Sequence, residues 1–66
     1  MGLDIGRKVK AYRKRAKLTQ EKLAERIDMS LRYIQNIEDG SRIPAISTLI
    51  KIAKALEVKV KNLIDF

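Results

Sequence analysis

Leu31, Arg32, Gln35 and Asn36 bring four side chains of distinctive contact chemistry into one six-residue stretch. Arginine matches the N7 and O6 acceptors of guanine, and glutamine and asparagine match the paired donor and acceptor of adenine. Leucine can contact the methyl group of thymine. The same residue types also occur on ordinary solvated helix faces. Residue types alone therefore leave two interpretations open, base contact and a plain polar surface.

Residues suited to catalysis or metal binding are scarce in this chain. The sequence contains no histidine and no cysteine, which removes the commonest general base, the commonest zinc ligand and any disulfide. Aspartate and glutamate are present, but no carboxylate pair stands with a nucleophile or a metal partner. We therefore expect no enzymatic activity, no metal site and no cofactor.

The polar stretch lies inside residues 19–40, TQEKLAERIDMSLRYIQNIEDG, which predict two short helices joined by a tight turn. Thr19 and Ser30 are suitable N-caps for helices over about 20–27 and 31–39. Gly40 follows the second helix, where a left-handed residue often ends a helix. Helices joined by so short a turn cross steeply, so this segment predicts a helix-turn-helix.

The remaining elements are also predicted to be helices. Apolar spacing predicts one over 5–16 with Asp4 as its cap, one over about 46–57, and one or two turns from about residue 60. The inward face of the 46–57 helix is expected to carry Ile46, Leu49, Ile50, Ala53 and Leu56. The 66 residues thus predict one domain, 1–66, an all-α bundle of five short helices with an aliphatic core of no more than about 3–5 kcal/mol.

Charge is distributed unevenly along the sequence. The net charge is +7, and residues 7–17 carry seven lysines and arginines without an acid. Such a run suggests a surface for phosphates, although a solvated helix is an equally good explanation of the run alone. A membrane-surface helix is disfavoured because the apolar face of this helix is needed for the core, and no apolar run is long enough to span a bilayer. A cytoplasmic location is expected.

These segments together resemble the phage repressor and Cro-type helix-turn-helix family, also called the XRE family. The matching pieces are IGRKVKAYR, LTQEKLAERI, IQNIEDG, RIP and STLIKIAKALEV, which cover nearly the whole chain. The resemblance implies five helices, the third in the major groove of double-stranded DNA, and a homodimer that reads a two-fold operator. The implied function is transcriptional regulation, most simply repression.

The resemblance also implies roles for individual residues. Leu31, Arg32 and Asn36 stand at base-contacting positions, and Gln35 is an additional contact to base or phosphate. Gln20 and Arg42 stand at phosphate-contacting positions, and Gln20 also braces the recognition helix. Tyr33 has two possible roles, a phosphate contact through its hydroxyl or packing through its ring.

Two further implications of the resemblance concern structure and assembly. Arg13 and Glu38 occupy the positions of a structural salt bridge between the first and third helices. Ile43, Leu63 and Phe66 are candidates for an apolar dimer interface, although Leu63 could equally close the core and Phe66 could be a frayed end.

The sequence departs from the family pattern at four positions, one of which is Leu31, where a polar residue is more usual. Asp28 replaces the glycine usual in the turn, where a positive φ is often needed. Ala45 and Lys59 stand where the last two helices usually have a capping residue. An alternative function, an antitoxin-like or adaptor module that binds protein and has little or no DNA specificity, is distinguished by retention on duplex DNA.

Overall fold

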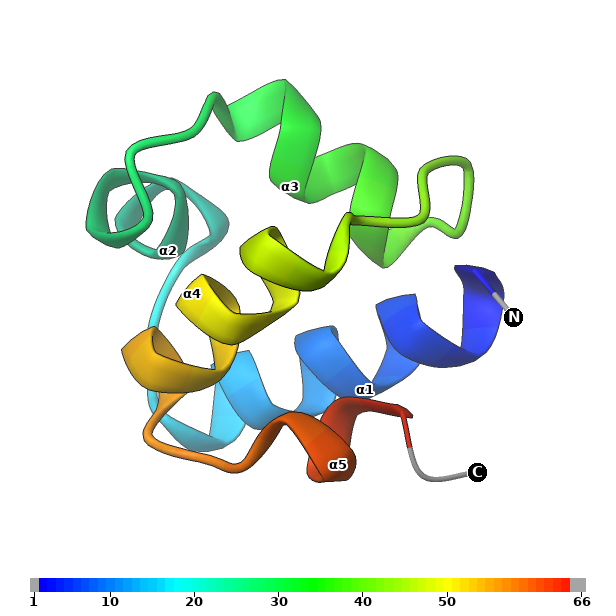
Figure 1. Ribbon diagram of the computed structural model, residues 1–66. Coiled ribbons are helices and arrows are strands. Elements are labelled where there is room, and N and C mark those ends of the chain that lie inside the picture. The colour runs from blue at the N-terminus through cyan, green and yellow to red at the C-terminus, as the bar shows by residue number, and fades with distance from the viewer. Residues whose placement is uncertain (1, 65–66) are drawn as a thin grey trace.

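The computed structural model describes residues 2–64. Within that range the regular elements are all helices, with no strand. The elements are α1 (Gly2–Arg15), α2 (Gln20–Arg26), α3 (Leu31–Glu38), α4 (Ile46–Leu56) and α5 (Val60–Ile64). The predicted all-α bundle of five short helices is confirmed. In Figure 1, α3 runs across the top of the molecule, α2 is seen nearly end-on beside it, and α1 and α5 lie below.

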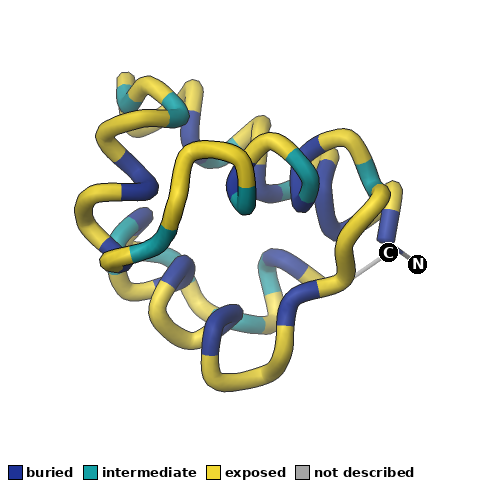
Figure 2. Tube along the Cα trace, turned by 90° about the horizontal axis from the view of Figure 1, so that it is seen from above, coloured by how far each residue is buried: buried dark blue, intermediate teal, exposed yellow. Residues whose placement is uncertain are grey.

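Within residues 2–64, twelve apolar residues from the five helices and the turn after α2 form one buried core, and none of the twelve is aromatic. Tyr12, Leu18 and Tyr33 pack against it from the edge. Figure 2 shows buried and exposed positions alternating along the helices. The core residues are Ile5, Val9, Leu23, Ala24, Ile27, Ile34, Ile37, Leu49, Ile52, Ala53, Leu56 and Leu63.

The predicted caps of the helix-turn-helix are present. The Thr19 hydroxyl accepts a hydrogen bond from the backbone N–H of Lys22, and the Ser30 hydroxyl accepts one from Tyr33, both at 3.1 Å. Each bond satisfies one of the free N–H groups at a helix start. Asp28 has a φ of 57°, so it does adopt the left-handed conformation expected at the glycine position.

The later helices begin with fewer caps, as the sequence indicated. Ala45 gives α4 no side-chain hydrogen bond. At the start of α5, the side-chain Oδ1 of Asn62 accepts from the backbone N–H of Lys59 at 3.0 Å. This bond is the reverse half of a capping box, in which a side chain inside the helix satisfies the N–H of the cap residue.

The first helix begins earlier than predicted. Asp4 lies within the first turn of α1 and is not its cap, because the helix extends back to Gly2. Tertiary contact explains the extension: a Cβ added to Gly2 would lie 2.8 Å from the Gly40 carbonyl oxygen, so the first turn is packed against the end of α3. Asp4 still complements the positive end of the helix dipole.

The buried face of α4 is rotated relative to the prediction. Leu49, Ala53 and Leu56 are buried as expected, but Ile46 and Ile50 are exposed. Ile52 takes their place in the core and Thr48 is also buried. The apolar arc of α4 is wider than the core beneath it, so one flank of the helix remains on the surface.

Candidate nucleic-acid interface

The outward face of α3 carries the polar side chains that the sequence singled out. Ile34 and Ile37 are completely buried and fix the helix to the core, whereas Arg32 and Gln35 are exposed and Asn36 is half-buried. Leu31 is 37% exposed at the first turn. Within residues 2–64 no hydrogen bond engages the side chains of Arg32, Gln35 or Asn36. Their donors and acceptors are therefore available to a ligand.

A buried ion pair holds the end of α3 to α1. Arg13 Nε donates to Glu38 Oε2 at 2.6 Å, and Arg13 Nη2 donates to Glu38 Oε1 at 3.0 Å. Arg13 Nη1 donates to the carbonyl oxygen of Leu18 at 2.8 Å, which also fixes the chain entering α2. Both side chains are less than a tenth exposed. The geometry is the bidentate arrangement that arginine forms with carboxylates.

Gln20 joins this network from the start of α2. Its Nε2 donates to Glu38 Oε1 at 3.0 Å, so one carboxylate connects α1, α2 and α3. This bond braces α3 against α2. The second N–H of the Gln20 amide, at the N-terminal end of α2, has no partner among residues 2–64.

The loop after α3 lies beside the polar face. The guanidinium carbon of Arg42 is 5.4 Å from the centroid of the Tyr33 ring. Asp39 Oδ1 accepts from the backbone N–H of Ser41 at 2.8 Å. The polar side chain of Ser41 beside the carboxyl, together with the backbone N–H that donates to it, holds the pKa of Asp39 below its ordinary value. Sequence reasoning left the role of the Tyr33 ring open and gave no sign of its contact with Arg42.

The basic residues of α1 divide between two flanks of the helix. Gly6 lies against the backbone of α3, and Lys10 and Lys14 follow it at successive helical turns. These exposed lysines therefore lie on the side of α1 that is turned toward α3. On the other flank, Arg15 lies over the Tyr12 ring at 5.5 Å, and both side chains line a surface hollow together with residues of α5.

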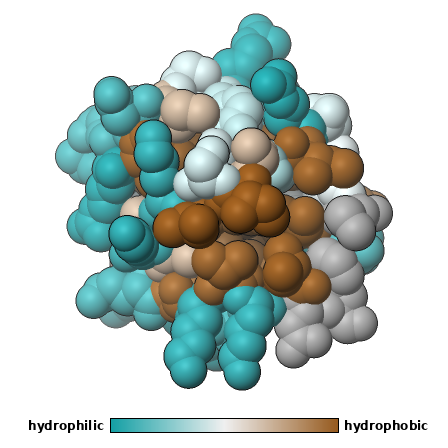
Figure 3. Space-filling model, in the orientation of Figure 1, coloured by the Kyte–Doolittle hydropathy of each residue, from teal (hydrophilic) through white to brown (hydrophobic). Residues whose placement is uncertain are grey.

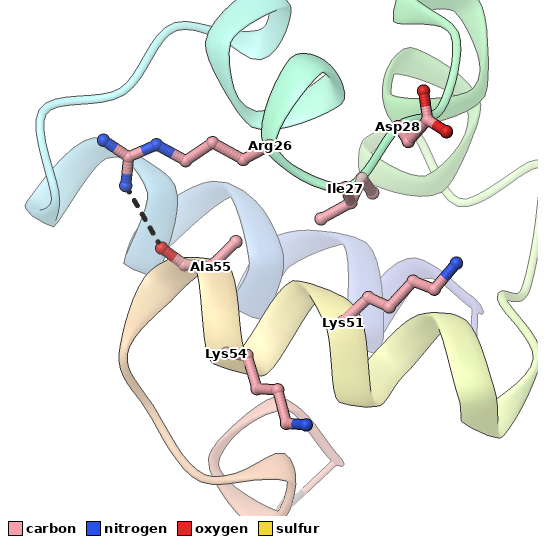
Figure 4. Close-up of a pocket in the computed structure, with 6 residues that line it drawn as sticks. All are labelled: Arg26, Ile27, Asp28, Lys51, Lys54 and Ala55. Carbon is pink, nitrogen blue, oxygen red and sulfur yellow. Dashed lines mark hydrogen bonds between the residues drawn. The ribbon is translucent and has the colours of Figure 1, made fainter.

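Another surface hollow lies between the end of α2 and the middle of α4, and Figure 4 shows its lining. Arg26 extends toward the Ala55 carbonyl oxygen, to which its Nη1 donates at 3.5 Å, whereas Lys51 and Lys54 point in other directions. The three cations do not converge on one point. Among residues 2–64 no group of three or more potential metal-binding side chains is assembled, and no helix is both long and apolar enough to cross a bilayer.

The candidate dimer residues are placed differently from one another. Ile43 is 55% exposed, as an interface residue should be. The prediction that Leu63 contributes to an exposed patch is wrong, because Leu63 is fully buried and closes the core beneath α5. Phe66 lies outside the described residues. The surface instead exposes Ile46, Ile50 and Ile64, and Figure 3 shows apolar side chains gathered over the face on which α4 lies.

Comparison with known proteins agrees with this arrangement. A family model described as helix-turn-helix matches residues 9–63, most of the chain. The chain belongs to the helix-turn-helix family. This finding and the relatives described next confirm the predicted resemblance to phage repressors and the prediction of a DNA-binding transcriptional regulator.

Two curated relatives and one solved structure illustrate the match. The helix-turn-helix chain is 42% identical over 65 residues to the control protein C.BamHI of Bacillus amyloliquefaciens, covering 97% of this chain and 80% of that protein. It is 39% identical over 62 residues to the immunity repressor protein of Bacillus phage phi105, covering 94% of this chain but only 43% of the repressor. The crystal structure of the restriction-modification controller protein C.AhdI from Aeromonas hydrophila superposes with a TM-score of 0.90 at 26% identity, covering 94% of each chain. These relatives give no support to an antitoxin-like or adaptor module.

Proposed function

We propose that this helix-turn-helix chain is a repressor that places α3 in the major groove of a specific DNA sequence. The observation that carries the proposal is the free hydrogen-bonding edge formed by Arg32, Gln35 and Asn36 on a helix fixed from behind by Ile34 and Ile37. A rigid helix with unsatisfied donors and acceptors on one face matches what base recognition in the major groove requires.

The side chains divide into two groups by their chemistry. We assign base contacts to Leu31, Arg32, Gln35 and Asn36, because they occupy the exposed first turns of α3 or its outward face. We assign phosphate contacts to Gln20 and Arg42, which flank α3 from α2 and from the following loop. The free amide N–H of Gln20 lies beside the backbone amides at the start of α2, where phosphate is favoured.

Repression follows from occupancy in this proposal. A helix-turn-helix protein bound in the major groove excludes polymerase from an overlapping promoter, and no chemical step is needed. This mechanism is consistent with the relatives, one of which is an immunity repressor and the others control or controller proteins. A cytoplasmic location follows from the proposed DNA target.

The base assignments are tested by selecting bound duplexes from a random pool, first with the unaltered chain and then with Arg32→Ala and Asn36→Ala. Each substitution is expected to cost about 1–3 kcal/mol on the selected site and to relax preference at one position. Lys51→Ala is the control, since Lys51 is exposed on α4 away from the proposed DNA face. An unchanged base preference in both α3 variants would contradict the proposed readout.

The phosphate assignments predict a different result from the same measurement. Gln20→Ala and Arg42→Ala are expected to weaken binding to all sequences alike and leave the selected site unchanged. Arg42→Ala should also reduce the slope of log affinity against log salt by about one, because one phosphate contact contributes about −0.9. A change of preferred sequence in Arg42→Ala would assign Arg42 to base contact instead.

A further inference from the structure

The backbone that carries Arg42 is anchored to the last turn of α3. Gly40 has a φ of 87°, which turns the chain back toward the helix. The backbone N–H of Arg42 donates to the backbone carbonyl oxygen of Asn36 at 3.1 Å. The Ser41 hydroxyl donates to the same backbone oxygen at 3.3 Å. The loop therefore moves with α3, and Arg42 begins from a fixed position beside the recognition helix.

The Arg42 side chain has a second support in the Tyr33 ring. A guanidinium within about 6 Å of an aromatic centroid is attracted to the ring face, and here the distance is 5.4 Å. Tyr33 is half-buried and packs against the core, so the ring is held in place from behind. An arginine in solution samples many rotamers, and ordering it on contact with a ligand opposes binding. A ring that orders it beforehand reduces that cost.

We propose that Tyr33 is a positioning residue whose ring holds the Arg42 guanidinium ready for DNA phosphate. In this proposal Tyr33 touches no DNA itself, and its hydroxyl is dispensable. The inference rests on the proposed function, because it concerns how one of the proposed phosphate contacts is prepared. It also decides between the two roles that the sequence left open for Tyr33 in favour of the ring, which packs against the core and lies under the Arg42 guanidinium.

The decisive experiment compares duplex affinities of Tyr33→Phe, Tyr33→Leu, Arg42→Ala and the double variant Tyr33→Leu/Arg42→Ala on the selected site. We expect Tyr33→Phe to bind within about twofold of the unaltered chain, because it keeps the ring. Tyr33→Leu should lose about two- to fivefold, the affinity equivalent of an exposed cation–π contact. That loss should disappear in the Arg42→Ala background, because the guanidinium that the ring positions is gone.

Two outcomes would overturn the proposal. If Tyr33→Phe loses as much affinity as Tyr33→Leu, the hydroxyl contacts DNA directly. If the losses of Tyr33→Leu and Arg42→Ala add, the two residues act independently. Tyr12→Leu is the matched control, because Tyr12 is also half-buried against the core with an arginine over its ring, but lies on the α1 flank that faces α5. It should leave DNA affinity unchanged.

A measurement on the free protein separates this inference from the proposed function. Side-chain protons of Arg42 that lie over the Tyr33 ring should show upfield ring-current shifts in NMR spectra of the unaltered chain and of Tyr33→Phe. If these shifts are absent in both proteins, the Arg42 guanidinium does not lie over the Tyr33 ring, and the inference is wrong. If the shifts are present but the unaltered chain binds no duplex, the proposed function fails and the positioning role for DNA fails with it. If the chain binds DNA and Arg42→Ala has no effect, the inference and the phosphate assignment of Arg42 both fail, whereas DNA binding through α3 stands.

Discussion

At the scale of single residues, the Glu38 carboxylate on α3 links three helices, because it accepts hydrogen bonds from side chains of α1 and α2. Arg13 is buried with it, so each charge depends on the other for compensation. Removing one member of a buried pair leaves an uncompensated charge, whereas replacing both by apolar residues is often tolerated. The pair therefore makes assembly of the bundle conditional on both residues.

This dependence gives a direct stability prediction. Glu38→Ala is expected to lower the free energy of unfolding by about 3–5 kcal/mol, which is as large as the total stability of a core of this size. Arg13→Met/Glu38→Leu should recover much of the loss. Urea denaturation of each variant measures both effects, and Glu21→Ala, an exposed acid on α2, is the control. A shift of Glu38→Ala no larger than that of the control would show that the pair contributes little.

At the scale of the elements, the close approach of α1 to α3 depends on Gly6. A Cβ added there would lie 2.3 Å from the Ile37 carbonyl oxygen and 2.7 Å from that of Glu38. Both neighbours are backbone atoms, so the helices themselves would have to move apart. The separation of α1 and α3 also sets the geometry of the Arg13–Glu38 pair, so the two features are coupled.

Gly6→Ala is therefore expected to destabilise the domain, although alanine favours helix more than glycine does. Overpacking of this kind costs about 1–3 kcal/mol, which exceeds the roughly 1 kcal/mol that alanine gains in helix propensity. Lys10→Ala, an exposed substitution one turn further along α1, is the control and should change stability by less than about 0.5 kcal/mol. A Gly6→Ala variant that melts at or above the temperature of the unaltered chain would mean that α1 can shift without loss.

The helices also show which features of the fold could be predicted from the sequence. Local chemistry determines the caps at Thr19 and Ser30 and the periodicity of each helix, and these could be predicted. The residues on the buried face of α4 could not be predicted in full, because Ile46, Leu49 and Ile50 belong to an apolar arc that is wider than the part of the core against which α4 packs. The contact distances of Gly6, Gln20 and Tyr33 could not be predicted from the sequence either. Each contact joins residues distant in sequence or depends on the exact placement of a ring.

At the scale of the whole molecule, the surplus apolar arc of α4 becomes a candidate partner surface. Ile46 and Ile50 lie one turn apart on the same flank of α4, with 65% and 41% of their surfaces exposed. Ile43 precedes α4, and Ile64 belongs to α5, which packs beside it. We propose that a second copy of the chain covers this surface, because a two-fold operator is read by a symmetric pair of chains and this is an exposed apolar surface.

Ile46→Lys tests this assembly without disturbing the core, since Ile46 is largely outside it. Each copy would lose about 1–2 kcal/mol of apolar burial, and two-fold symmetry doubles the effect to about 2–4 kcal/mol of dimer stability. Sedimentation should show a shift toward monomer, and affinity for a two-half-site duplex should fall while affinity for a single half-site is retained. Ser47→Lys adds the same charge to the neighbouring exposed position and should leave both unchanged. If Ile46→Lys keeps the mass and the two-site affinity of the unaltered chain, the second copy does not sit on this face of α4, and the operator is bound by another arrangement.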